Sequence, residues 1–219
     1  MIYLVTGGRG FIGSHFVNRV LSEGHKVIDI DKCTYAASQS LPWDDNDNYT
    51  HIKEDICKID HIPVCDLIVN FAAESHVDNS IEAPKVFLHS NVDGVFNLLN
   101  LLRAKVYQKP LFVQISTDEV YGDVNEGEKN ELSMLSPSNP YSATKAAAEM
   151  LLLSYARTYG IDYQIARSTN NYGPRQYPEK LIPRIIHSLN NNQKIPLHGD
   201  GSYVRDWLYV EDNTDAIYK

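Results

Sequence analysis

The stretch Met1-Ile2-Tyr3-Leu4-Val5-Thr6-Gly7-Gly8-Arg9-Gly10-Phe11-Ile12-Gly13 decides the fold. Its apolar, β-prone start predicts a buried strand, and the periodicity from Phe11 to Ser22 predicts a helix. Between them Gly7 permits a tight turn, Gly10 lets backbone approach a pyrophosphate, and Gly13 lets the helix pack on the strand. The helix N-terminus then offers free N–H groups to phosphates. A glycine run alone marks only a turn, but its place between strand and helix predicts a dinucleotide site.

The next strand, residues 26–31, ends in an acidic residue. Asp31 follows Gly13 by 18 residues and shares a face with Asp29. A carboxylate at this distance accepts the adenosine ribose hydroxyls and repels a 2′-phosphate, which favours NAD over NADP. The alternative is a solvated aspartate at a strand end.

Further strands are predicted at residues 49–53, 66–71, 111–115 and 161–167. Helices are predicted from Pro84 to about Lys105 and over residues 141–159. This alternation predicts an α/β fold with a doubly wound parallel sheet, the Rossmann architecture. We expect an NAD-binding domain over residues 1–167 and the start of a smaller substrate-binding region over 168–219. The chain stops inside a helix predicted from about Glu211, so we expect it to be truncated.

Composition restricts the partners. The net charge of −8 and the lack of a basic stripe argue against nucleic acid. No apolar run approaches the ~20 residues of a membrane span, and the N-terminus lacks the basic region of a signal peptide. Cys33, Cys57 and Cys65 lack metal-ligand spacing, so we expect reduced thiols, no metal site and a cytoplasmic location.

The candidate catalytic residues follow the strand at 111–115. Thr117, Asp118 and Glu119 fall just past its end, and Tyr141 and Lys145 lie four residues apart on one helical face. A Lys ammonium beside a phenol favours the phenolate, a general base. Adjacent Asp and Glu could supply one acid and one base. The alternative is a surface carboxylate pair and a core tyrosine.

Taken together, these motifs resemble the nucleotide-sugar 4,6-dehydratases, which act on dTDP-glucose or UDP-glucose and belong to the extended short-chain dehydrogenase/reductases. The resemblance rests on Ser-Thr-Asp-Glu-Val-Tyr-Gly at 116–122, on Tyr-x-x-x-Lys at 141–145 and on Ala-Ala-Glu-Ser-His-Val-Asp at 72–78. It implies NAD-dependent conversion of the glucose nucleotide to its 4-keto-6-deoxy form. C4 is oxidised, the C6 hydroxyl leaves as water, and a hydride returns to C6.

The resemblance also implies residue roles. Tyr141, assisted by Lys145, removes the O4 proton while Thr117 hydrogen-bonds that oxygen. Glu119 abstracts the C5 proton, and protonated Asp118 assists loss of water. The implied cofactor contacts are Gly7, Gly10, Phe11, Ile12, Gly13, Asp31, Lys32, Thr34, Asp55, Ile56, Ala72, Ala73, Ser75, Ser90, Tyr141, Lys145 and Asn171. The implied substrate contacts are Ser75, His76, Thr117, Asn170, Lys180, Leu181, Pro196, His198 and Arg205.

Two of the substrate positions leave alternatives open. Arg205 is the best candidate for the diphosphate, because a guanidinium grips two phosphate oxygens at once; a structural salt bridge is its alternative. His198 stands where many bacterial members carry tyrosine against the base, so the choice between thymine and uracil stays open.

The sequence leaves other functions open. A sugar-nucleotide epimerase or decarboxylase needs the glycine turn, Tyr141 and Lys145, but not the pair Asp118 and Glu119, and this pair favours the dehydratase. A truncated, non-catalytic NAD-binding module is a further alternative. By analogy with the family we expect a homodimer through the helices after Pro84 and Pro140, and a product that enters 6-deoxyhexose synthesis of the rhamnose type.

Overall fold

The computed structural model describes residues 1–104, 109–124, 126–195, 200–202 and 204–219. Its elements, in chain order, are β1 (Ile2–Thr6), α1 (Phe11–Ser22), β2 (Lys26–Ile30), β3 (Tyr49–Ile52), β4 (Leu67–Asn70), α2 (Val77–Glu82), α3 (Pro84–Phe87), the π-helix η1 (Leu88–Asp93), α4 (Gly94–Arg103), β5 (Leu111–Thr117), the 3-10 helix η2 (Asp118–Tyr121), α5 (Pro140–Tyr159), β6 (Tyr163–Ser168), β7 (Asn170–Tyr172), α6 (Leu181–Asn190), β8 (Trp207–Tyr209) and α7 (Val210–Tyr218).

A six-stranded parallel sheet forms the centre, with strand order β3-β2-β1-β4-β5-β6. The order reverses direction between β1 and β4, and ligands of such sheets bind at the carboxyl ends of the strands beside this point. The predicted doubly wound sheet is confirmed. Its geometry therefore places the binding crevice where the glycine turn after β1 meets the segment after β4.

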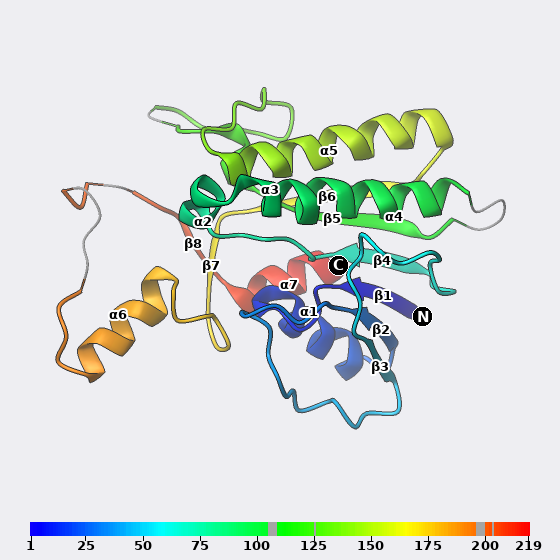
Figure 1. The fold of residues 1–219 in the computed structure, drawn as a ribbon, viewed down its shortest axis with the longest axis horizontal. Helices are drawn as coiled ribbons and strands as arrows, with labels where there is room; N and C mark the ends of the chain where they lie inside the picture. Colours follow the sequence, from blue (N-terminus) through cyan, green and yellow to red (C-terminus); the bar gives the residue numbers. More distant parts are fainter. Residues whose placement is uncertain (105–108, 125, 196–199, 203) are drawn as a thin grey trace.

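Helices cover both faces of the sheet (Figure 1). On one face α4 and α5 pack over Leu4, Ile68 and Phe112. On the other, α1 packs over Tyr3 and Val5, and α7 lies beside α1. Because side chains alternate along a strand, neighbouring residues of β1 enter different cores. Both faces are thus buried, as the apolar runs of the strands predict.

The helix predicted from Pro84 carries an unpredicted π-helical segment. η1 interrupts the α-helical hydrogen bonding between α3 and α4, and π segments occur often at functional sites. Ser90 and Asn91 lie on η1, and both are buried. The segment thus holds two buried polar side chains, Ser90 bonded to Lys32 and Asn91 bonded to Glu74.

Two other features differ from the prediction. β5 continues through Thr117, so Thr117 ends the strand and is not past it, while Asp118 and Glu119 open η2. The reason is pairing with β6, where Thr117 stands opposite Ser168. β7 and β8 form a separate two-stranded sheet, and α6 lies between them in the chain.

In the described ranges, no helix combines the length and apolar character needed to cross a membrane.

Candidate active site

The turn after β1 is tight enough to exclude side chains. Gly7 has a φ of +72°, and a Cβ there would lie 2.7 Å from the Ala72 nitrogen. A Cβ on Gly13 would lie 2.2 Å from the Gly7 carbonyl oxygen. The helix α1 that follows has no capping side chain and no acidic residue in its first turn. Its first N–H groups are therefore free to bind an anion, as predicted for a pyrophosphate.

Asp31 stands at the end of β2, beside this turn. Its two carboxylate oxygens accept the backbone N–H groups of Arg9, at 3.0 Å, and Cys33, at 2.7 Å. Lys32 turns the other way and donates to the Ser90 hydroxyl at 2.8 Å. The Lys32 ammonium also faces Glu74 at 3.8 Å, an ion pair that the sequence did not suggest. A carboxylate held rigidly at this place suits the ribose role predicted for Asp31.

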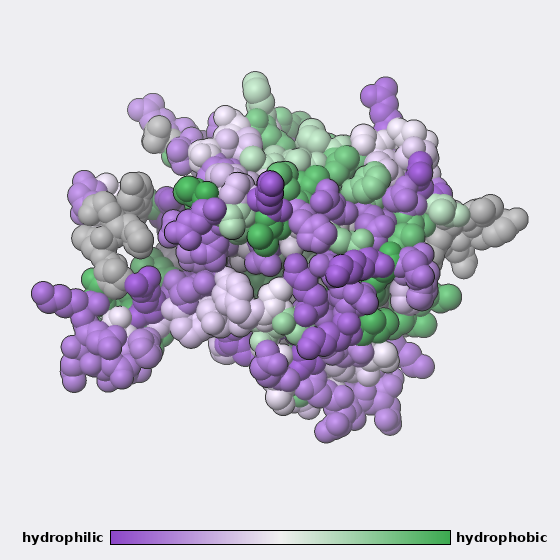
Figure 2. Space-filling view, in the orientation of Figure 1, coloured by the Kyte–Doolittle hydropathy of each residue, from purple (hydrophilic) through white to green (hydrophobic). Residues whose placement is uncertain are grey.

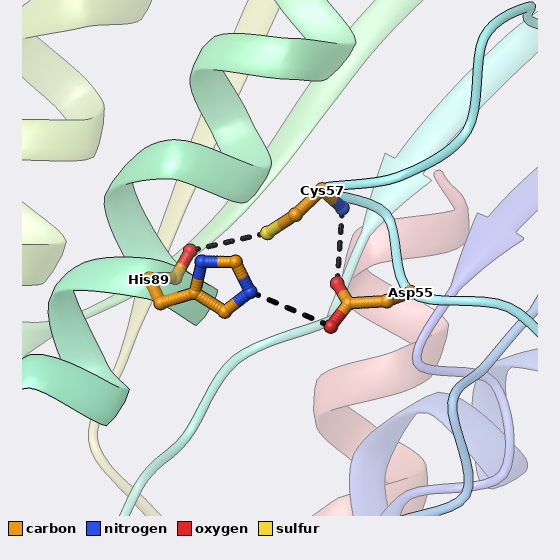
Figure 3. Close-up of side chains that lie close together, drawn as sticks. All are labelled: Asp55, Cys57 and His89. Atoms are coloured by element: carbon orange, nitrogen blue, oxygen red, sulfur yellow. Dashed lines mark hydrogen bonds and ion pairs between the residues drawn. The ribbon is translucent and has the colours of Figure 1, made fainter.

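Asp55, Cys57 and His89 lie close together (Figure 3), and Asp55 also lines the binding crevice. Their ligand-type atoms lie within 4.8 Å of one another, which could hold a metal ion. They also bond to each other: Cys57 N–H donates to Asp55 at 3.0 Å, and the thiol donates to the His89 carbonyl at 3.3 Å. Burial, then the bond to Asp55, raises the pKa of Cys57 to about 12, and metals bind the thiolate. These contacts fasten the loop after β3 to η1, and the expected lack of a metal site stays a prediction.

The predicted cofactor residues gather around one cleft, with a single exception. The residues that line this cleft include Gly7, Gly10, Phe11, Ile12, Gly13, Asp31, Lys32, Thr34, Asp55, Ile56, Ala72, Ala73, Ser75, Ser90, Tyr141 and Lys145. Asn171 does not line it. Asn171 is buried on β7, where its amide nitrogen donates to Ser168 and to the Thr169 carbonyl and its side-chain oxygen has no partner.

Tyr141 and Lys145 enter the cleft from the first turns of α5. The helix begins with a capping box between Asn139 and Ser142 and with Pro140 at its first position. The Tyr141 hydroxyl lies near the Thr117 side chain, and Lys145 donates to the Ile115 carbonyl at 2.6 Å. Both side chains therefore face the end of β5.

The electrostatics of this pair differ from the sequence expectation. Burial, and next the charge of Glu119, raises the pKa of Tyr141, and the nearby Thr117 hydroxyl offsets only part of this rise. Burial lowers the pKa of Lys145 to about 8. The Lys145 ammonium is directed at a backbone carbonyl here, so it does not lower the pKa of the phenol as expected from the spacing alone.

Asp118 and Glu119 are half-buried and have different surroundings. Burial raises the pKa of both carboxyl groups. Asp118 accepts from the Thr117 hydroxyl at 3.2 Å and faces the negative charge of Asp206. Glu119 accepts from the Asn139 amide at 3.3 Å, and Arg205 and Lys180 pull its pKa down. The charged neighbours of the two carboxyl groups thus differ, but Asp118 also raises the pKa of Glu119, and the pKa of both groups lies above its ordinary value.

The predicted substrate residues are less closely assembled. Ser75 and Lys180 line the cleft, and Lys180 donates to the Ser75 carbonyl at 3.0 Å. His76 lies just before α2, and its Nδ1 is buried without a partner.

The remaining substrate residues lie around the cleft or beyond the description. Asn170 begins β7, Leu181 is exposed at the start of α6, and Arg205 is exposed and lies close enough to Glu119 to lower its pKa. Pro196 and His198 lie outside the described residues.

Several lining residues were not predicted. Tyr35 donates to the Glu179 carboxylate at 3.0 Å, and its ring contacts Tyr177. Gln176 also lines the cleft. This bridge joins the segment after β2 to the segment before α6. Nothing in the sequence shows that these two segments meet.

The fold and the site define a Rossmann enzyme of the short-chain dehydrogenase/reductase class, with a dinucleotide cleft and a Tyr-x-x-x-Lys pair. The family described as GDP-mannose 4,6 dehydratase matches residues 4–219. The chain belongs to this family of nucleotide-sugar 4,6-dehydratases, as the sequence motifs predict.

Individual relatives agree. The low-salt glycan biosynthesis protein Agl12 of Haloferax volcanii is 46% identical over 99% of this chain and 72% of its own length. A dTDP-glucose 4,6-dehydratase of Streptomyces niveus is 44% identical over 99% of this chain and 68% of its own length. Among solved structures, the dTDP-glucose 4,6-dehydratase DesIV of Streptomyces venezuelae, with NAD and TYD bound, has a TM-score of 0.93 and 41% identity over 99% of this chain and 70% of that one.

Proposed function

We propose that the protein uses bound NAD to convert dTDP-glucose to its 4-keto-6-deoxy form, with UDP-glucose as the alternative substrate. One observation carries the proposal: Thr117, Asp118 and Glu119 close the end of β5 beside the buried Tyr141. An oxidation at C4 needs the tyrosine, whereas loss of water across C5 and C6 needs an acid and a base as well. The relatives named as dTDP-glucose dehydratases support the choice of thymine nucleotide.

The residues of the cleft fit NAD. The glycine turn leaves no room for a Cβ at positions 7 and 13, and the uncapped start of α1 faces it. Asp31 would hold the ribose hydroxyls, Asp55 and Ile56 the adenine end, and Asn171 the nicotinamide end. The unpartnered side-chain oxygen of Asn171 is suited to accept from an amide. NAD, when bound, supplies a hydride acceptor at C4 and returns the hydride at C6, so the reaction has no net oxidation.

The protein's own groups then handle the protons. Tyr141 takes the O4 proton, and Thr117, whose side chain lies near Tyr141, bonds the same oxygen as it becomes a carbonyl. The new keto group acidifies the C5 hydrogen, which Glu119 abstracts. Asp118 gives its proton to the departing C6 hydroxyl, and Glu119 returns the proton to C5 when the hydride has reached C6. The basis for this proposed division of roles is the difference in charged neighbours, with Asp206 near Asp118 and with Arg205 and Lys180 near Glu119.

Substrate contacts are part of the same proposal. The residues proposed to bind the sugar nucleotide are Ser75, His76, Asn170, Lys180, Leu181, Pro196, His198 and Arg205. Arg205 is the proposed diphosphate ligand, because its positive charge reaches the neighbourhood of Glu119. The unpartnered Nδ1 of His76 is free to bond a substrate hydroxyl.

An epimerase or decarboxylase on this scaffold would leave Asp118 and Glu119 without a task. The test is incubation of the NAD-loaded protein with dTDP-glucose and, separately, UDP-glucose, followed by mass spectrometry. A product lighter by one water supports the proposal. A product of unchanged mass with inverted C4 identifies an epimerase, and retained NAD with no turnover identifies a binding module.

We extend the proposal to assembly and setting. Exposed apolar side chains lie along α3, η1, α4 and α5, among them Val86, Leu88, Phe96 and Met150. In Figure 2, apolar residues are exposed among polar ones over the region where Figure 1 places these helices. Such a surface suits a second copy of the chain, so we propose a homodimer. We also propose a cytoplasmic location and a product used for 6-deoxyhexoses of the rhamnose type.

A further inference from the structure

The guanidinium of Arg9 has every hydrogen-bond donor occupied. Its side chain is 6% exposed. Nε donates to the Ser38 carbonyl at 3.0 Å, and Nη2 to the Gln39 carbonyl at 3.0 Å. Nη1 and Nη2 donate to the two Asp44 oxygens at 2.7 and 3.2 Å, and Nη1 also to the Tyr49 hydroxyl at 3.4 Å. A guanidinium has five N–H groups, and all five have partners.

Asp44 is the charged member of this arrangement. Its carboxylate holds Arg9 in the bidentate manner that makes such pairs strong, and it also accepts the Leu41 N–H at 2.8 Å. The Arg9 guanidinium keeps the pKa of Asp44 below its ordinary value. The Arg9 carbonyl accepts the Ser38 N–H at 2.8 Å. The segment 38–44 is thus fastened to the glycine turn from both sides.

The backbone of Arg9 lies next to Asp31, the residue proposed to select the cofactor. Its backbone N–H donates to Asp31 at 3.0 Å. The Asp31 side chain lines the NAD cleft, whereas the Arg9 side chain lines a separate cavity with His51 and Lys53. An arginine near the ribose carboxylate is the group that accommodates the 2′-phosphate of NADP in dinucleotide folds. The chain therefore carries such an arginine and turns it away from the cleft.

We propose that Asp44 is a cofactor-specificity residue: by holding the Arg9 guanidinium in the separate cavity, it withholds from the cleft an arginine that would bind a 2′-phosphate. Selection of NAD then has two parts. Asp31 repels the phosphate, and Asp44 removes the cation that would offset this repulsion. The inference rests on the proposed use of NAD, and it makes Asp44 matter to a ligand that it does not touch.

The test is direct binding of NAD and NADP, by calorimetry, to protein freed of carried-over nucleotide. The variants are Asp31→Asn, Asp31→Asn/Asp44→Ala and Asp31→Asn/Asp44→Ala/Arg9→Met, with Asp31→Asn/Asp44→Asn as the smaller change in case the alanine variant does not fold. Freeing a charged hydrogen-bond donor should raise the NADP-to-NAD affinity ratio about tenfold above that of Asp31→Asn. Arg9→Met should cancel this gain.

Each result decides the matter. An equal ratio in Asp31→Asn and in both double variants would overturn the inference, and so would a gain that survives Arg9→Met. A gain of NADP binding cannot come from partial unfolding, so it would support the inference even if the variants are less stable. If the parent protein binds no NAD, the proposed function fails; if it binds NAD and the ratios do not change, only the role of Asp44 fails.

Discussion

Asp118 and Glu119 are adjacent carboxyl groups whose pKa values are both raised by burial and whose charged neighbours differ. We expect Asp118→Asn and Glu119→Gln to slow loss of water by about 10²-fold or more while C4 oxidation continues. A transient NADH absorbance should then build up without a product lighter by one water. Tyr141→Phe should instead abolish the transient, because the O4 proton has no acceptor.

A matched control is Asp123→Asn, on the exposed loop after η2. It should turn over at the parent rate. Parent rates of dehydration in both Asp118→Asn and Glu119→Gln would show that these carboxyl groups do not serve as acid and base. A full NADH transient in Tyr141→Phe would exclude Tyr141 as the first base.

Lys145 sets a second prediction at this scale, the pH dependence. Its pKa, lowered by burial to about 8, means that the ammonium is present below that pH and lost above it. If the ammonium must assist Tyr141, kcat/KM should fall as the pH rises through about 8. Lys145→Arg keeps the positive charge at every accessible pH. Its kcat/KM should be lower than that of the parent protein, but it should no longer fall as the pH rises through about 8. An alkaline limb near 8 that persists in Lys145→Arg would assign it to another group.

At the scale of elements, α5 is tied to β6 by a buried ion pair. Glu149, fully buried, receives Arg167 Nη2 at 2.6 Å and Nε at 3.1 Å, and also the Ser116 hydroxyl. Removing one partner leaves the other charge buried and uncompensated. We expect Glu149→Gln to lower the free energy of unfolding by about 3 kcal/mol, measured by urea denaturation.

The control for that change is Glu23→Gln, which breaks the more exposed pair with Arg19 in α1. It should change the free energy of unfolding much less than Glu149→Gln does, because exposed ion pairs contribute little to stability. Similar losses in the two variants would mean that the Glu149 pair is not special. Because Glu149 lies one turn after Lys145, its loss should also move the alkaline limb of activity to lower pH, since the Glu149 charge raises the pKa of Lys145.

The elements also show how far a sequence can be read. The strands of the large sheet and helices α1 and α5 follow from local apolar runs, glycines and caps, so they were predictable. β7 was not, because its three residues, Asn170–Tyr172, become a strand only by pairing with Trp207–Tyr209 far along the chain. η1 was missed because a π segment has the composition of an ordinary helix. Thr117 joined β5 through its pairing with β6.

The same division holds for the site across the whole molecule. The glycine turn, Asp31 and Tyr141 can be recognised from their spacing in the sequence, and the structure brings them to one cleft. The direction of Lys145 toward Ile115 and the bridge from Tyr35 to Glu179 depend on which segments meet in space. A sequence pattern does not show which distant segments pack against each other, so these contacts could not be predicted.

The proposed dimer gives the prediction that belongs to the whole molecule. Phe96 on α4 and Met150 on α5 are about half exposed, at 47% and 48%, and in a dimer through these helices both would be buried. Phe96→Glu and Met150→Glu would place charges in that interface and should shift the protein from dimer to monomer in analytical ultracentrifugation. Val64→Glu, at an apolar residue of the loop after β3 that is 83% exposed, should leave the dimer intact. A monomeric parent at micromolar concentration would contradict the proposal, as would equal dissociation in all three variants.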